Sequence, residues 1–305
     1  MSFQRKIRVL LLGYPYFVNR LAELGRGSEY IFEIAPRNRW KFWWALSRVD
    51  LVYQIGGDLR PNRLYQRIFK LKKKLIMHWV GSDILEMQTW QAAGNSFALD
   101  LLSEAVHWAE VSWTAKELGE LGVNPKIIPL TPTSFPSELK ELPKEFVVLT
   151  YLPEGKEEFY GVTQIFKLAS AFPQVIFLAA ATPTAKQAEI AWPANVIPIG
   201  WVDRMSELYS EVVLLIRLTK HDGLSFMVLE ALAQGRYVFW SYPLDGVVQI
   251  IDDEMLLINF NKLYQDFLEK KLTYNQIGYE TVAEFYRPEI VWQQIQAEIK
   301  SVLSR

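Results

Sequence analysis

Residues 212–240 read VVLLIRLTKHDGLSFMVLEALAQGRYVFW. The branched apolar run 212–218 predicts a strand, a polar loop follows, and a helix is expected from Ser225 to Gly235, where the glycine ends it. Residues 237–240 are apolar again and predict a second strand. Strands that are apolar throughout and alternate with helices form parallel sheets covered on both faces. This stretch therefore predicts an α/β fold.

The same alternation extends in both directions along the chain. Upstream, strands are predicted at 7–12, 30–35, 51–55, 75–80, 111–114 and 127–130, with helices near 17–24, 40–47 and 64–71. Further strands are predicted at 146–152, 175–180 and 196–199, with a helix over 162–172. A short helix is expected at 247–251, and 279–303 has a broadly helical pattern. Two doubly wound sheets in series are expected.

Four prolines between Pro129 and Pro143, with several Ser and Thr residues, are typical of a linker between domains. A chain of 305 residues suits two α/β domains. We expect a Rossmann-like domain at 1–133, a second at 134–278, and a helix in 279–305 that packs back toward the first domain. A cleft between the domains would then be available to ligands.

Composition excludes several kinds of protein. With 33 basic and 34 acidic side chains the net charge is -1, so no global field attracts nucleic acid. The absence of cysteine excludes disulfides, thiol catalysis and cysteine-bound metals, and it favours a cytoplasmic protein. Gly13 and Pro15 cut short the apolar run near the N-terminus, so we expect no secretory signal, and no uncharged run is long enough to span a bilayer.

The loop after 212–218 has the features of a ligand site. Ligands of open α/β sheets bind beyond the carboxyl ends of strands, and the free N–H groups at a helix start favour a diphosphate. Gly223 allows close backbone approach, and seven residues separate Asp222 from Glu230. One carboxylate can then face a sugar and the other a ribose. The alternative is that Asp222 caps the helix and Glu230 is solvated.

Residues 217–235 resemble the donor-site signature of the retaining family 4 glycosyltransferases (glycosyl transferases group 1), which have the GT-B fold of two Rossmann-like domains. The match continues at 238–241 and 246–248. The resemblance implies a UDP or GDP sugar as donor, no cofactor and no metal. It implies that Glu230 holds the ribose and Asp222 contacts the donor sugar, and that the base is lined by Gly200 and Val202. The diphosphate loop would be Gly223, Leu224, Ser225 and Phe226.

The chain departs from the family pattern at two places. Residues 151–156, YLPEGK, lack the arginine that neutralises the departing diphosphate in this family. Lys156 is one candidate replacement. Arg217 and Lys220 are two more, from residues 217–225 of the donor-site signature, which we call the signature loop. Each is alternatively a solvated surface charge. The first acid is Asp222 where the family more often has glutamate.

The first domain would lie on the acceptor side and face the donor through residues 78–83, HWVGSD. His78 is a candidate catalytic residue that bonds a sugar hydroxyl, or else a core histidine. Gly13, Gly56 and Gly57 are candidates for backbone approach to a ligand, or simply turn residues.

Residues 37–48, RNRWKFWWALSR, have the composition of a helix lying in a membrane interface, and basic side chains at 70–74 would add attraction to anionic lipid. The alternative is a helix that packs its tryptophans on the sheet. A peripheral position at the inner face of the membrane is one expectation.

The function implied by the resemblance is metal-independent, retaining transfer of a hexose or related sugar to a glycan, lipid-linked or small-molecule acceptor, in carbohydrate biosynthesis. Two alternatives are a catalytically weak or inactive nucleotide-sugar-binding protein and a nucleotide-sugar epimerase or hydrolase with the same fold.

Overall fold

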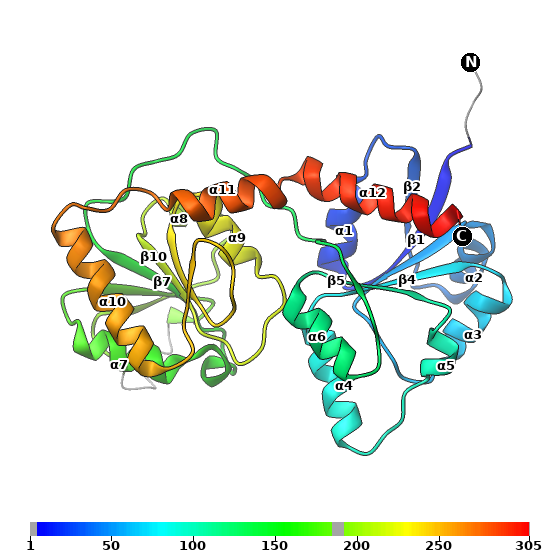
Figure 1. Ribbon diagram of the computed structural model, residues 1–305, viewed down its shortest axis with the longest axis horizontal. Coiled ribbons are helices and arrows are strands. Elements are labelled where there is room, and N and C mark those ends of the chain that lie inside the picture. The colour runs from blue at the N-terminus through cyan, green and yellow to red at the C-terminus, as the bar shows by residue number, and fades with distance from the viewer. Residues whose placement is uncertain (1–4, 185–191, 305) are drawn as a thin grey trace. The chain divides into compact units, whose positions relative to one another are not determined.

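The computed structural model describes residues 5–184 and 192–304, which form two compact units (Figure 1). Unit 1 comprises Met1–Pro132 and Pro288–Arg305, and unit 2 comprises Thr133–Arg287. The division lies one residue from the boundary expected at the proline-rich linker. Residues 279–287, which we expected to belong to a terminal helix, are part of unit 2.

Unit 1 contains a parallel six-stranded sheet in the order β2-β1-β3-β4-β5-β6. The strands are β1 (Ile7–Gly13), β2 (Tyr30–Ile34), β3 (Leu51–Ile55), β4 (Lys74–Trp79), β5 (Val106–Ala109) and β6 (Lys126–Ile127). The helices are α1 (Pro15–Leu24), α2 (Arg39–Arg48), α3 (Arg63–Lys70), α4 (Ser82–Ala92), α5 (Leu99–Leu102), α6 (Ser112–Glu120) and α12 (Pro288–Ser304).

Helices cover both faces of this sheet, as continuous apolar strands require. On one face α2 and α3 bury Leu46 and Ile68 in a cluster shared with α4, α5 and α6. On the other face α1 buries Leu21 against Ile295 of α12, which lies beside it (Figure 1). Residues of β1 and α12, from opposite ends of the chain, are therefore buried in the same hydrophobic cluster.

Unit 2 contains a second parallel six-stranded sheet, in the order β12-β11-β10-β7-β8-β9. The strands are β7 (Val147–Tyr151), β8 (Ile176–Ala180), β9 (Val196–Gly200), β10 (Leu214–Arg217), β11 (Tyr237–Trp240) and β12 (Val247–Gln249). The helices are the 3-10 turn η1 (Glu157–Tyr160), α7 (Val162–Ala171), α8 (Met205–Tyr209), α9 (Phe226–Ala233), α10 (Asp253–Leu268) and α11 (Gln276–Phe285). The strand order reverses between β7 and β10, where ligands of such sheets bind.

Three sequence predictions of secondary structure are wrong. Residues 111–114 are not a strand, because Ser112 begins α6 and the strand lies earlier, at β5. Residues 247–251 are not a helix, because 247–249 pair with β11 as the edge strand β12. The C-terminal helical pattern is two helices, α11 and α12, which are separated before Pro288, since a proline disfavours helix at the residue that precedes it.

No helix in 5–184 or 192–304 is long and apolar enough to cross a membrane.

Candidate functional site

The loops after β7 and β10 lie against each other at the carboxyl edge of the unit 2 sheet. The backbone N–H of Lys220 donates to the carbonyl of Phe159 at 3.0 Å, and the N–H of Thr219 donates to Ser241 Oγ at 2.9 Å. Gly161 has a φ of +76°, and a Cβ there would lie 2.8 Å from Leu218 Cβ. A glycine is thus required where the two loops make contact.

Arg217 and Asp222 form an ion pair within the signature loop. Arg217 Nε donates to Asp222 Oδ2 at 2.6 Å, and the two side chains are 9% and 15% exposed. Trp240 Nε1 donates to the same carboxylate oxygen at 3.3 Å. The Arg217 guanidinium carbon lies 5.4 Å from the ring centroid of Tyr151 and 5.2 Å from that of Tyr160.

The ion pair with Asp222 determines both the protonation state of Arg217 and whether its charge is available to a ligand. Burial alone would lower the pKa of Arg217, but the adjacent Asp222 carboxylate more than offsets burial and the pKa is raised. Arg217 therefore stays charged, and its charge is compensated by Asp222 rather than directed at solvent. The sequence indicated Arg217 and Asp222 separately, but it did not indicate that they pair or that Tyr151, Tyr160 and Trp240 surround them. The signal available was an arginine at the end of a strand and an acid five residues later.

The start of α9 presents backbone donors. Ser225 is the N-cap, yet its side chain forms no capping hydrogen bond. Gly223, Leu224 and Ser225 are buried, and Phe226 is half-buried. The first N–H groups of a helix have no partner within the helix, so a bound anion can accept from them.

Glu230 lies on the second turn of α9 and is half-buried. The hydroxyl of Tyr209, at the end of α8, is 3.2 Å from Glu230 Oε2 and 3.2 Å from the carbonyl of Met227. α8 follows β9 and the turn at Gly200, whose φ is +69° and around which a Cβ would meet nothing within 4 Å. Val202, two residues on, is half-buried. Tyr209 was not singled out from the sequence.

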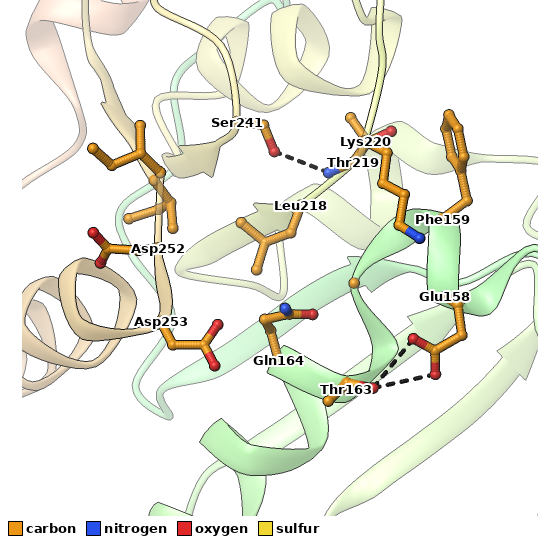
Figure 2. A pocket seen from close by; sticks show the side chains of 13 residues that line it. Glu158, Phe159, Thr163, Gln164, Leu218, Thr219, Lys220, Ser241, Asp252 and Asp253 are labelled. Carbon is orange, nitrogen blue, oxygen red and sulfur yellow. Dashed lines mark hydrogen bonds between the residues drawn. The ribbon is translucent and has the colours of Figure 1, made fainter.

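A cavity of about 510 Å³ opens at the same edge of the sheet, lined by the segments that follow β7, β10, β11 and β12. Figure 2 shows its lining side chains. The starts of α7 and α10 line it, and so do Leu218, Thr219 and Lys220 of the signature loop. Asp222, Glu230 and the start of α9 do not line it. Figure 2 shows Thr163 bonded to Glu158, with the Lys220 side chain pointing toward the segment that carries Phe159.

The charges of this cavity do not suit a diphosphate. Among the described residues that line it, Glu158, Asp252 and Asp253 contribute carboxylates and Lys220 contributes the one ammonium group. Asp252, which is exposed, caps α10 by accepting from the N–H of Met255 at 2.7 Å. An anion in the cavity would meet net negative charge, whereas the start of α9 offers N–H groups and an acid, Asp222, that Arg217 already compensates.

Lys156 and Lys220 are both exposed, Lys156 directly before η1 and Lys220 on the signature loop. Within the described residues neither lysine takes part in an ion pair. Among the described cations predicted for this edge, these two lysines form no ion pair, whereas Arg217 is paired with Asp222. In the same described residues, no group of three or more His, Cys, Asp or Glu side chains lies together as a metal site.

In unit 1, His78 is fully buried and both of its ring nitrogens have partners. Nε2 lies 2.8 Å from the carbonyl of Ile128 and therefore carries the proton, while Nδ1 accepts from the Tyr53 hydroxyl at 2.7 Å. Burial lowers its pKa to about 3, so the ring is neutral. The geometry favours the core interpretation of His78 over a catalytic one.

The three candidate glycines of unit 1 have packing roles. A Cβ on Gly13 would lie 1.7 Å from the carbonyl oxygen of Ile55, and one on Gly57 would collide with the ring of Trp79 at 2.2 Å. Gly56 has a φ of +92°. The Gly57 N–H donates to Asp83 Oδ2 at 2.6 Å, and Asp83 is a buried carboxylate that the sequence did not reveal.

Asp83 also accepts from the N–H groups of Val80 and Gly81. Burial raises its pKa to about 6 against the opposing effect of these hydrogen bonds. This carboxylate organises the loop after β4 and connects it to the loop after β3.

No known protein-family profile and no curated protein matches this chain in sequence. Solved structures do match in fold. HepE from Anabaena, in complex with UDP, is 13% identical, with a TM-score of 0.73 over 97% of this chain and 100% of its own. Sucrose-phosphate synthase from Thermosynechococcus elongatus is 13% identical, with a TM-score of 0.67 over 98% of this chain and 99% of its own.

The lipopolysaccharide outer core galactosyltransferase WaaB, in its apo form, is 12% identical, with a TM-score of 0.65 over 97% of this chain and 99% of its own. These matches extend over both units, and each unit by itself has a doubly wound parallel sheet. The chain has the GT-B fold that these solved structures share.

Proposed function

We propose that this protein is a metal-independent, retaining glycosyltransferase that uses a nucleoside-diphosphate sugar. The observation that carries the proposal is the arrangement at the carboxyl edge of the unit 2 sheet, where an uncapped helix start and Glu230 lie on the same helix, α9. Among the structures with this fold, HepE holds UDP and WaaB is a galactosyltransferase.

The diphosphate of the donor binds the start of α9 in this proposal. The backbone N–H groups of residues 223–226 donate to its phosphate oxygens, and the buried glycine at 223 leaves room for close approach. The acidic lining of the neighbouring cavity argues against placing the diphosphate there.

The nucleoside binds between α8 and α9. Glu230 is held by Tyr209 and accepts from the ribose hydroxyls, since an ionised carboxylate has lone pairs for several donors. Gly200, which has open space where a side chain would stand, and Val202 contact the base.

The transfer step breaks the bond between the anomeric carbon and the diphosphate oxygen and forms a bond from that carbon to the acceptor oxygen. The acceptor's proton passes to the departing diphosphate, and attack from the leaving-group side preserves the configuration. The growing charge on the diphosphate is met by the start of α9 and by Lys156 and Lys220. Arg217 does not supply this charge directly, because Asp222 compensates it.

The Arg217–Asp222 pair also favours a second candidate function, that of a nucleotide-sugar-binding protein with weak or no catalysis. An acid that is bonded to Arg217 and Trp240 is less available to a donor sugar, and the enclosed arginine is less available to a diphosphate. Donor hydrolysis separates the two functions. A transferase without acceptor is expected to release free sugar slowly from its donor, whereas a binding protein binds the same donor and leaves it intact.

The binding site is tested by Glu230→Gln. An amide oxygen accepts less strongly than a carboxylate, so the affinity for UDP or GDP is expected to fall by about 1.5 to 3 kcal/mol, or roughly 10- to 150-fold. Calorimetry measures this directly. The control is Glu284→Gln on α11, an exposed acid outside the site. Equal affinity in the two variants, with both folded, would contradict the assignment of Glu230.

A further inference from the structure

α2 and α3 of unit 1 present an exposed surface of tryptophan and basic side chains, which we call the basic aromatic face. Trp40 is 83% exposed and Trp44 is 61% exposed. Beside them are exposed arginines and lysines on the two helices and their flanks: Arg37, Arg39, Lys41, Arg48, Arg63, Arg67, Lys70, Lys72 and Lys74.

The core of unit 1 does not require these two tryptophans. The sheet-facing side of α2 is filled by Ala45 and Leu46, with Phe42 and Trp43 packed at its margin. Trp40 and Trp44 lie outside this cluster, and large aromatic side chains this exposed mark interaction sites when they are grouped. The sequence left open whether the tryptophans of 37–48 pack on the sheet or face outward. Of the three, Trp43 packs inward.

Charge is segregated on this face. Residues 34–49 and 59–82 contain eleven Lys or Arg and no Asp or Glu. The whole chain has a net charge of -1, so the remaining residues sum to -12. The potential over α2 and α3 is therefore strongly positive although the protein as a whole is nearly neutral.

The basic side chains are ordered around the tryptophan rings. The guanidinium carbon of Arg48 lies 4.0 Å from the ring centroid of Trp44, and that of Arg67 lies 4.6 Å from the ring centroid of Trp43. Arg39, Trp40, Trp43 and Arg67 line a cavity of about 390 Å³. Two arginines and two indoles around one cavity suit a phosphate group with an apolar neighbour.

We propose that the basic aromatic face binds the surface of an anionic phospholipid bilayer. Tryptophan is most stable at the headgroup level, where its ring is half in hydrocarbon and its N–H is solvated, and the surrounding arginines and lysines pair with lipid phosphates. Trp40 and Trp44 insert, the cavity between α2 and α3 takes a headgroup phosphate, and Lys70, Lys72 and Lys74 add attraction.

The ring contacts favour a bilayer over a nucleic acid. Single-stranded nucleic acid is bound by stacking its bases on exposed ring faces. Arg48 already covers one face of Trp44, and Arg67 covers one face of Trp43. Insertion into a headgroup layer leaves these contacts intact.

Co-sedimentation of the full chain with vesicles tests the proposal. We expect it to bind vesicles that contain about 30 mol% phosphatidylglycerol, not to bind vesicles of phosphatidylcholine alone, and to dissociate in about 0.5 M NaCl. Binding both vesicle types equally, or neither, would overturn the proposal.

Matched variants locate the surface. Trp40→Ala combined with Trp44→Ala is expected to weaken vesicle binding at least tenfold, while Trp201→Ala, which removes a 77% exposed tryptophan of unit 2, leaves it within twofold. Lys72→Gln with Lys74→Gln is expected to weaken binding about 30-fold, and the control Lys116→Gln with Lys262→Gln leaves it within twofold. All of these side chains are exposed, so the fold is expected to persist, which melting curves verify.

Three results would contradict the assignment. The first is equal loss in the face variants and their controls. The second is full binding by the double tryptophan variant. The third is a DNA oligonucleotide that binds the face more tightly than the anionic vesicles do, which would make the surface a nucleic-acid site. Because vesicle binding is measured without donor or acceptor, its outcome does not depend on the proposed transferase activity.

Discussion

Asp222, the first acid of the donor-site signature, accepts hydrogen bonds from Arg217 and Trp240. It therefore has a structural role in addition to any contact with a ligand. Ions that are taken out of water are costly, and a buried pair is retained only because each charge offsets the other. Removing one partner leaves the other charge buried and alone. The stability of the protein therefore reports on this pair independently of any activity.

We expect Asp222→Asn to lower the free energy of unfolding of unit 2 by about 3 to 5 kcal/mol, since Arg217 loses its counterion while 9% exposed. Adding Arg217→Met to that variant is expected to recover part of the loss. Urea unfolding of the single and double variants measures both effects. If Asp222→Asn unfolds at the wild-type urea concentration, the carboxylate has no structural role and a purely ligand-facing one is favoured.

Glu110 is a buried carboxylate of unit 1 whose protonation is coupled to folding. It accepts from the N–H of Leu130 at 3.2 Å and from the Thr131 hydroxyl. Burial raises its pKa to about 8, with a further rise from the nearby Asp83. Because the folded-state pKa is above the unfolded value, its contribution to stability is present below about pH 4.5 and is lost as the pH rises through about 8.

Glu110→Gln removes this titration, so the stability of the variant relative to the wild type is expected to increase between pH 5 and pH 8, by up to about 1.4 kcal/mol per pH unit. Urea midpoints at several pH values give the difference. Glu120→Gln, an exposed acid of α6, serves as the control and should show no such trend. A difference that is constant with pH would show that Glu110 is already ionised when folded.

The sequence indicated which residue types were candidates but could not supply their partners. His78 was equally consistent with a ligand contact and a core position, because the Tyr53 hydroxyl and the Ile128 carbonyl that bond it come from 25 and 50 residues away. Asp83 and Glu110 were missed for the same reason, since a carboxylate is recognised as buried only once the loops around it are placed.

At the scale of the element, strands buried on both faces were predicted with bounds close to those observed, because continuous apolar runs have few other stable environments. The errors in the predicted strands came from short apolar runs. Residues 106–109 include His107, so the pattern there was weaker than at 111–114, where Val111 in fact precedes α6. The edge strand β12 is only half-buried, which removes the continuous apolar signal.

The contact between η1, α7 and the signature loop depends on Gly161. Its φ of +76° is unfavourable for other residues, and an alanine Cβ would lie 2.8 Å from Leu218 Cβ and 3.1 Å from the Leu218 carbonyl oxygen. Gly155 provides a matched control because its φ is +75° but a Cβ there meets nothing within 4 Å. The two sites thus separate backbone strain from steric contact.

We expect Gly155→Ala to cost about 1 kcal/mol of stability and Gly161→Ala to cost about 2 to 4 kcal/mol, because the latter also displaces the start of α7 from β10. Gly161→Ala should in addition weaken UDP binding, since the signature loop must shift. Urea unfolding and calorimetry measure the two effects. Equal costs at the two glycines would show that the loops adjust without strain.

At the scale of the whole molecule, two units of the same sheet type differ in what their carboxyl edges offer a ligand. In unit 2 the edge carries an uncapped helix start, Glu230 and exposed lysines. In unit 1 the corresponding glycines and acid are used by packing, as Gly13, Gly57 and Asp83 illustrate. Similar strand, loop and helix patterns therefore predicted the fold of both units equally well, but they did not predict which loops would have side chains and N–H groups available to a ligand.

The proposal that sugar transfer needs no divalent metal ion is tested by adding EDTA. Oxygen ligands for Mg²⁺ or Mn²⁺ are commonly paired acids, and the acidic run Asp252-Asp253-Glu254 is engaged at the start of α10, where Asp252 caps the helix and Asp253 pairs with Lys167 at 2.8 Å. In the mechanism we propose, the charge of the leaving diphosphate is met by the start of α9 and by Lys156 and Lys220. Once a donor is identified, its turnover is expected to persist in EDTA.

Lys156→Gln and Lys220→Gln are each expected to lower turnover more than UDP affinity, with Lys262→Gln on α10 as the control. Activity that is lost in EDTA and returns with Mn²⁺ would overturn both the metal-free mechanism and the roles of the two lysines.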